Sequence, residues 1–226
     1  MREIVLDTET TGLDPLAGHR IVEVACLELV NHVPTGNSFQ RYVNPDRDMP
    51  PDAFQVHGIS GEFLADKPRF AEIVDGFLEF IADDPLIIHN AEFDLRFINA
   101  ELDRVKRSKL PRERAVDTVS LARKRFPGAQ ASLDALCRRF AIDLSQRTKH
   151  GALLDCELLG QVYLELIGGR EPGLGLADQR PLEAMVASQI VVPTTARAPR
   201  VSAPSEAELA AHALFLKKLK DPLWLA

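Results

Sequence analysis

Two short apolar runs, each leading straight into a group of polar residues, constrain the fold of this chain more than any other feature. The first spans Glu3 to Leu6 and the second spans Pro85 to His89. Compact runs of this length are typical of strands that are buried inside a sheet. Between them, apolar residues recur at helical spacing from Pro68 to Ala82, which predicts an amphipathic helix. The chain is therefore expected to alternate buried strands with helices.

The segments after the first run predict an antiparallel opening of three strands. Arg20 to Val30 is apolar with interspersed glutamates, and Asn37 to Val43 alternates in character. Pro34-Thr35-Gly36-Asn37 is a turn signal between them. Further along, a brief strand is expected around 115–116, and helices are expected over 52–58, 91–105, 118–126, 132–140 and 151–167.

The net charge of −6 is unevenly distributed. It argues against a protein that coats nucleic acid through bulk electrostatics. Between Arg104 and Lys149, however, 13 Lys and Arg stand against 4 Asp and Glu. This basic segment could line a path for a phosphate backbone, or it could form ordinary solvated helix faces.

Composition and cysteine use point to a cytoplasmic protein that does not bind a membrane. The chain is 46% hydrophobic and 27% charged, and no apolar run approaches the ~20 residues of a membrane helix. No basic-then-apolar leader precedes the first strand. Cys26, Cys137 and Cys156 share no short spacing, which favours reduced, mostly buried thiols over disulfides or a zinc site.

Four acidic residues and one histidine lie in three motifs at the edges of apolar segments. Asp7 and Glu9 lie two apart, so in an extended strand they face one side together. Asp94 lies at the start of a helix, where the helix dipole alone could account for it. His150 and Asp155 lie at the start of the last long helix.

Carboxylates that converge without cations repel one another, and a pair of divalent metal ions removes that cost. Ligation by oxygen alone favours Mg²⁺ or Mn²⁺ over softer metals. Histidine titrates near pH 6.5 when unperturbed, so an imidazole beside such a site can accept a proton at neutral pH. This combination is typical of phosphodiester hydrolysis.

The motifs occur in longer segments that resemble the DnaQ-like exonucleases of the DEDDh class, in particular the proofreading subunits of bacterial replicative polymerases. These segments are IVLDTETTG (4–12), FQVHGI (54–59), DTVSLARK (117–124), SLDALC (132–137) and KHGALLD (149–155). The resemblance covers about 1–169 and resumes at the C-terminal helix and 223–226. It implies a ribonuclease-H-like α/β fold, with a mixed central sheet, helices on both faces and a flexible C-terminal arm.

The resemblance also implies an activity, the removal of nucleotides from a DNA 3′ end as 5′-monophosphates. Asp7, Glu9, Asp94 and Asp155 would hold two Mg²⁺ (or Mn²⁺) ions, roughly 4 Å apart, and His150 would act as the general base.

Five further positions match residues near the terminal nucleotide in this class: Thr10, His57, His89, Asn90 and Phe93. His89 and Asn90 can donate hydrogen bonds to a phosphate or sugar. Phe93 could stack on a base or fill the core, and His57 could contact the nucleotide or cap a helix.

The resemblance divides the chain into an exonuclease domain (1–169), a flexible linker (170–204) and a polymerase-binding segment (205–226). Ser205 and Glu208 form a capping-box pattern in that last segment, which is expected to dock on the polymerase (alpha) subunit. Segment 171–176 stands where the class binds the sliding clamp, but it lacks the usual Gln and bulky aromatic end, which weakens the prediction of tight clamp binding. The sequence leaves open whether a small accessory subunit is a further partner.

Two alternatives remain beside a proofreading exonuclease. One is a free-standing exonuclease that acts on RNA ends or short oligonucleotides, although the long C-terminal arm argues against it. The other is a structural subunit without catalysis, although all five catalytic positions are intact.

Overall fold

The computed structural model describes residues 1–145, 147, 149–168 and 204–218. The chain divides into two compact units, 1–175 and 176–226. The described part of the second unit is built on helix α8 (Glu206–Leu216), whose first turn has the predicted capping box: the Ser205 hydroxyl accepts the backbone N–H of Glu208. Most of the predicted linker (170–204), the clamp segment (171–176) and the last eight residues (219–226) lie outside the described residues.

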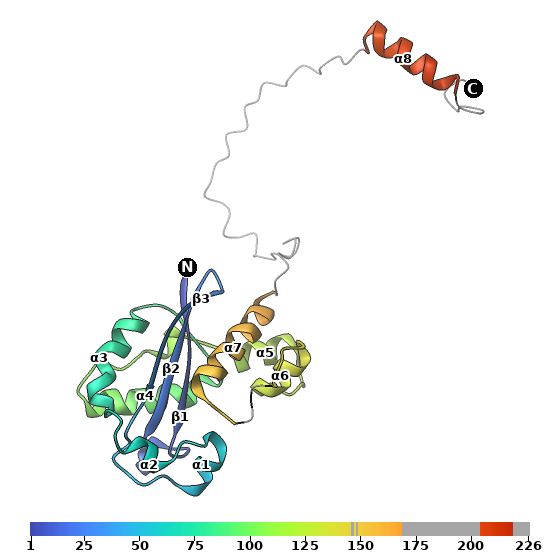
Figure 1. Cartoon of the computed structure of the whole chain (residues 1–226). Coiled ribbons are helices and arrows are strands. Elements are labelled where there is room, and N and C mark those ends of the chain that lie inside the picture. The colour runs from blue at the N-terminus through green and yellow to red at the C-terminus, as the bar shows by residue number, and fades with distance from the viewer. Residues whose placement is uncertain (146, 148, 169–203, 219–226) are drawn as a thin grey trace. The chain divides into compact units, whose positions relative to one another are not determined.

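The first unit is built on one mixed sheet of five strands in the order β3-β2-β1-β4-β5 (Figure 1). The strands are β1 (Arg2–Thr10), β2 (Ile21–Val30), β3 (Val33–Tyr42), β4 (Leu86–Ile88) and β5 (Ala115–Asp117). The first three pair antiparallel, whereas β4 runs parallel to both β1 and β5. The predicted mixed sheet and its antiparallel opening are therefore confirmed.

Helices cover both faces of this sheet, because β1 carries apolar side chains on both sides. Ile4 and Leu6 pack into one core with α3 (Phe70–Ile81) and α4 (Ala91–Arg104). Val5, which points the other way, packs into a second core with the remaining three long helices. These are α5 (Thr118–Arg125), α6 (Leu133–Arg139) and α7 (Ala152–Ile167).

Shorter elements lie near the end of β1 opposite to the N-terminus. Helices α1 (Pro51–His57) and α2 (Gly61–Leu64) lie at this end of the sheet in Figure 1. Two 3₁₀ turns, η1 (Pro15–Ala17) and η2 (Arg112–Arg114), were not predicted.

The predicted turn between β2 and β3 is wrong in position. The chain reverses at Asn31 and His32, which both have positive φ (52° and 67°), the backbone of a two-residue hairpin turn. Pro34 is already paired with Leu29 in β3, and Gly36 (φ 91°) lies where the register with β2 shifts. The turn-like residues therefore form an irregularity inside a longer strand.

The three cysteines are free and buried, as predicted. Among the helices that the structure describes, none has both the length and the apolar character needed to cross a membrane.

Candidate active site

The acidic motifs meet at one edge of the sheet. Asp7 and Glu9 lie in the last four residues of β1, whose parallel neighbours β4 and β5 end at the same edge. In open α/β sheets, ligands bind outside the carboxyl ends of such strands. Asp94 lies in the first turn of α4, just after β4, and Asp155 lies in the first turn of α7.

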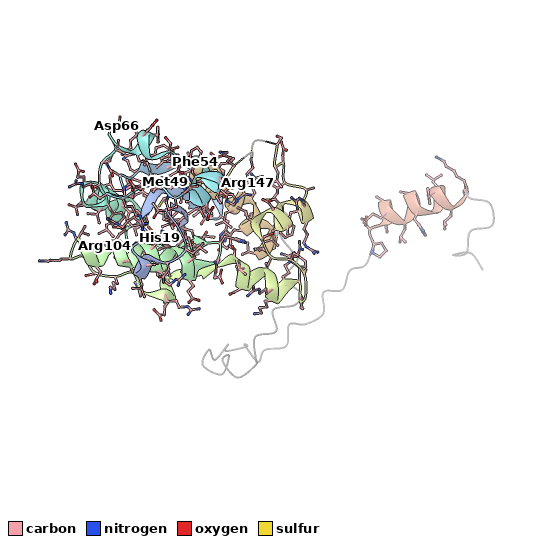
Figure 2. All side chains as sticks on the ribbon, turned by 90° about the horizontal axis from the view of Figure 1, so that it is seen from below. His19, Met49, Phe54, Asp66, Arg104 and Arg147 are labelled. Atoms are coloured by element: carbon pink, nitrogen blue, oxygen red, sulfur yellow. The ribbon has the colours of Figure 1, made fainter. Side chains whose placement is uncertain are left out.

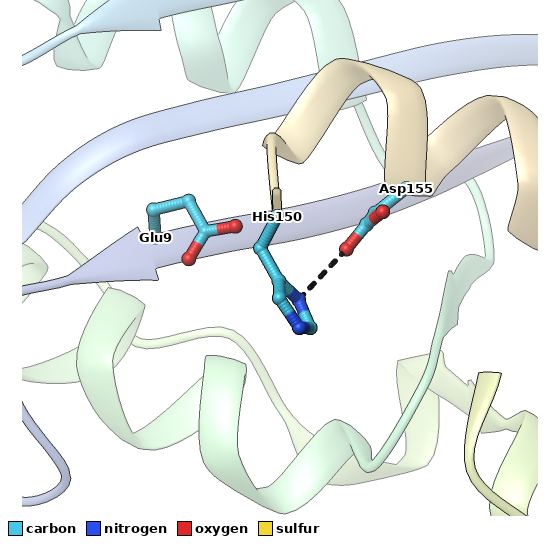
Figure 3. A group of neighbouring side chains, drawn as sticks. All are labelled: Glu9, His150 and Asp155. Atoms are coloured by element: carbon cyan, nitrogen blue, oxygen red, sulfur yellow. Dashed lines mark ion pairs between the residues drawn. The ribbon is translucent and has the colours of Figure 1, made fainter. Parts of the chain in front are cut away.

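The pleat of β1 distributes its side chains between the two helices. On the α7 side, ligand atoms of Glu9, His150 and Asp155 all lie within 4.8 Å of one another (Figure 3). His150 Nδ1 is 3.2 Å from Asp155 Oδ2. On the α4 side, the Thr8 hydroxyl donates to Asp94 Oδ1 at 2.7 Å. These contacts fit the predicted orientation of Asp7 and Glu9 on one side of the strand, and Thr8 lies on the other.

Burial makes three of the carboxyl groups hard to ionise, and repulsion between acids adds to it at Asp7 and Glu9. Burial, then the charges of Asp94, Glu9 and Asp155, raises the pKa of Asp7 well above its ordinary value. Burial and the neighbouring acids raise the pKa of Glu9 to about 8. Burial raises the pKa of Asp94 to about 7, although the Thr8 hydroxyl opposes the shift. The site has more negative charge than it can stabilise alone.

Asp155 differs because a cation holds it. Burial alone would raise its pKa, but hydrogen bonds from Arg147 and His150 outweigh burial and keep the pKa below its ordinary value. Arg147 (labelled in Figure 2) donates from Nε to Oδ1 at 2.6 Å and from Nη2 to Oδ2 at 2.7 Å. Its Nη2 also lies 2.8 Å from His150 Nδ1, and its Nη1 pairs with Asp134.

Sequence reasoning missed Arg147 because it is one of 13 cations in the basic segment 104–149. Its spacing, three residues before His150 and eight before Asp155, was the available signal.

Glu23 on β2 was also missed, and it positions α7. One of its oxygens accepts the backbone N–H of Ala152 at 3.2 Å, and the other accepts the Gln40 amide at 2.7 Å. Burial raises its pKa. Glu23 therefore fixes the first turn of the helix that carries Asp155, and the signal was an acid in an otherwise apolar strand.

Asp117 plays a matching part for α4. As the N-cap of α5 it accepts the N–H of Val119, and it also accepts the N–H groups of Asn90 and Ala91. Asn90 adopts positive φ (67°) at the start of α4. Asp117 therefore holds the turn from which Asp94 is presented.

The predicted substrate residues fall into three neighbouring cavities. Thr10, His57 and Phe93 line a cavity of about 500 Å³, together with Glu9. His89 lines a carboxylate cavity of about 330 Å³. Its walls are Asp7, His89, Ser132, Leu133, Asp134, Arg147, His150 and Asp155. Asn90 instead lines a third, polar cavity of about 750 Å³, of which His89 is also part.

Local contacts describe these residues further. Burial lowers the pKa of both His57 and His89, which favours their neutral forms. His89 Nδ1 lies 2.9 Å from the Thr118 hydroxyl, and the Thr10 hydroxyl donates to the Gly12 carbonyl at 2.6 Å. Phe93 stacks at a tilt on Phe97, so it belongs partly to the core.

The donor set fits divalent metal ions. Buried carboxylates with raised pKa values are stabilised when a hard cation replaces their protons. Glu9 and Asp155 offer carboxylate oxygens within 4.8 Å of one another. Asp7 and Asp94 are close enough to interact electrostatically, and Asp7 also interacts with Glu9 and Asp155. The division into four carboxylate ligands and a general base, His150, stays a prediction.

Comparison with known proteins agrees with this geometry. The family model described as Exonuclease matches residues 4–163. In solved structures, the fold resembles exonuclease X in complex with 5′ overhanging duplex DNA (TM-score 0.57, 26% identity, 73% of this chain and 90% of that one). It also resembles the nuclease domain of 3′hExo, a DEDDh family member bound to rAMP (TM-score 0.65, 16% identity, 74% and 91%). The ribonuclease-H-like fold expected from the sequence is confirmed, and the chain belongs to the exonuclease family.

Within that family the chain groups with the epsilon subunits of bacterial DNA polymerase III. The subunit from Rickettsia felis is 51% identical over 222 residues, which cover 97% of both chains. The subunit from Escherichia coli is 44% identical over 241 residues, which cover 100% of this chain and 98% of that one.

Proposed function

We propose that this chain is the proofreading 3′–5′ DNA exonuclease of a bacterial replicative polymerase and acts in the cytoplasm. The gathering of Asp7, Glu9, Asp94 and Asp155 beside His150 at one edge of the sheet is the observation that carries the proposal. The similarity to DNA polymerase III epsilon subunits along the whole chain supports the biological role.

In this proposal the carboxylates hold two divalent ions, Mg²⁺ or Mn²⁺. When bound, such ions supply positive charge for the attacking water and for the leaving 3′ oxygen. His150, whose side chain is 48% exposed, accepts the proton of the attacking water and releases it to solvent. The product is a 5′-monophosphate.

The residues around the ions orient the terminal nucleotide. The cavity lined by Thr10, His57 and Phe93 adjoins Glu9 and has room for a nucleoside. His89, on the wall of the carboxylate cavity, faces the phosphate side. A mispaired end reaches such a site more readily because less pairing energy is lost when it frays.

The test is digestion of a 5′-labelled DNA primer with a 3′ mismatch, in Mg²⁺. We expect the wild type to shorten the primer from its 3′ end and Asp7→Asn to be slower by about 100- to 1,000-fold. Glu79→Gln, an exposed acid on α3, is the matched control and keeps full activity. Equal rates for the wild type and Asp7→Asn would reject this site, and a strong preference for an RNA primer would favour the free-standing exonuclease.

We further propose that residues 205–226 dock on the polymerase subunit. Helix α8 presents Leu209, Leu214 and Phe215 to solvent, and apolar side chains of this kind are typical anchors. The full chain should co-purify with the polymerase subunit, and a chain that ends at Pro204 should not. Undiminished binding of the shortened chain would contradict the proposal. The same assay with the sliding clamp tests segment 171–176, and co-purified small proteins would reveal an accessory subunit.

A further inference from the structure

The carboxylate cavity contains a cation that belongs to the chain itself. The Arg147 side chain is only 9% exposed, and its guanidinium forms two parallel hydrogen bonds with Asp155. A bidentate pair of this kind is among the strongest contacts that a carboxylate makes. Both oxygens of Asp155 are therefore already engaged.

The cavity through which an ion can reach Asp155 is also lined by Arg147. The Asp155 side chain is 6% exposed, and the cavity that it lines is also lined by Arg147 and His150. Mg²⁺ requires carboxylate oxygens at about 2.0–2.1 Å, in near-octahedral geometry. The guanidinium occupies one lone-pair position on each oxygen of Asp155, and its positive charge repels an ion that enters the same cavity.

The surroundings of Arg147 provide a second partner for it. Its Nη1 pairs with Asp134, which lies on α6 and is not among the predicted metal ligands. The Asp134 side chain is 40% exposed, so it can keep a guanidinium at the cavity wall without further burial of charge. Arg147 can thus release Asp155 and remain paired.

We propose that Arg147 is the resident counter-cation of this site and that a divalent ion binds Asp155 only by displacing the Arg147 guanidinium. This inference rests on the metal site in the proposed function. It makes Arg147 a positioning residue, which holds Asp155 in place until the ion arrives and sets the ion concentration at which the site fills.

The test measures Mn²⁺ binding without DNA, by the electron paramagnetic resonance signal of the free ion. Arg147→Gln removes both the positive charge and the bidentate pair of hydrogen bonds with Asp155. We expect Mn²⁺ to bind this variant roughly 10- to 100-fold more tightly. Arg147→Lys keeps the charge but cannot form the bidentate pair, so we expect its Mn²⁺ affinity to rise by roughly 3- to 10-fold. Arg138→Gln is the matched control, because the exposed Arg138 approaches the same Asp134 at 3.7 Å. Its Mn²⁺ affinity should stay within about twofold of the wild type.

Each other outcome overturns the inference. Unchanged or weaker Mn²⁺ binding by Arg147→Gln would mean that Arg147 only orients Asp155 for the ion. Wild-type Mn²⁺ affinity in Arg147→Lys would mean that the positive charge repels the ion without any displacement of the guanidinium. This conservative variant also decides the question if Arg147→Gln does not fold. Absence of Mn²⁺ binding in every variant would remove the metal site as well. Mn²⁺ binding that follows the expected order in a protein without exonuclease activity would leave this inference standing and remove only the proposed function.

Discussion

The first turns of α4 and α7 each present one buried aspartate to the same site, yet the pKa values of the two carboxyl groups shift in opposite directions. Asp94 receives the Thr8 hydroxyl, and burial raises its pKa to about 7. Asp155 accepts two hydrogen bonds from the Arg147 guanidinium, and its pKa lies below the ordinary value. Both lie near a helix N-terminus, which favours negative charge equally. The comparison shows that a buried cation decides the charge of such a group, whereas the helix position does not.

The largest expected effect separates the two aspartates by stability. In a chelator at pH 8, Asp155→Asn replaces the charged main partner of Arg147 with a neutral amide. Among the residues that the structure describes, only the partly exposed Asp134 then remains as an ionic partner, and we expect a cost of about 3 kcal/mol. For a domain of this size the melting temperature falls by roughly 6–12 °C. Asp94→Asn gives Asp7 a neutral neighbour and keeps an oxygen for Thr8, so its melting temperature should equal or exceed that of the wild type. Equal losses in both variants, measured by thermal melting, would contradict the comparison.

An intermediate effect concerns pH in the absence of divalent ions. Glu9 and Asp94 bind protons more tightly in the folded chain than when unfolded, so their contribution to stability is present at low pH and is lost as pH rises towards 7–8. The depressed pKa of Asp155 acts in the opposite direction, but only below its unfolded value of about 4.

In a chelator, we therefore expect the melting temperature to fall by roughly 5 °C between pH 6 and pH 8.5. Added Mg²⁺ should restore more stability at pH 8.5 than at pH 6, because the ion competes with protons for the same carboxylates. If the melting temperature in chelator rises over this range, folding does not raise the pKa values of these carboxyl groups.

The smallest effect comes from a third acid in a first helical turn. Glu92 lies in the same turn of α4 as Asp94, but it is exposed. Glu92→Gln removes only the interaction of an exposed charge with the helix dipole, worth about 0.3–1 kcal/mol. Its melting curve and its exonuclease rate should lie close to those of the wild type. A loss comparable with that of Asp155→Asn would mean that helix position matters more than the buried partner.

The sequence was sufficient for the elements and for the ends of the strands that carry the site. The compact apolar run from Glu3 to Leu6 predicts a buried strand, and the spacing of Asp7 and Glu9 predicts their shared side. The helix expected over 132–140 is present as α6, and the Ser132 hydroxyl caps it by accepting the Ala135 N–H. Such features depend on residues that are neighbours in the chain.

The sequence was insufficient where distant residues decide the outcome. Glu23 and Ala152 are joined across 129 positions, and Thr8 and Asp94 across 86. The hairpin turn was misplaced because Asn31 and His32 form it with positive φ, while the stronger turn signal of Gly36 is absorbed by a shift in register. Local patterns do not report such pairings, so the contacts that tune the site appear only in the folded chain.

Burial of the three cysteines makes the chain convenient for chemical labelling. Cys26, Cys137 and Cys156 are enclosed in the two cores, and burial raises the pKa of each thiol, so maleimides should spare them in the folded protein. A single cysteine introduced at exposed Ala211 on α8 would then be the one fast-reacting thiol. A fluorophore placed there would test the proposed docking of the polymerase subunit on α8 without removal of any native sulfur.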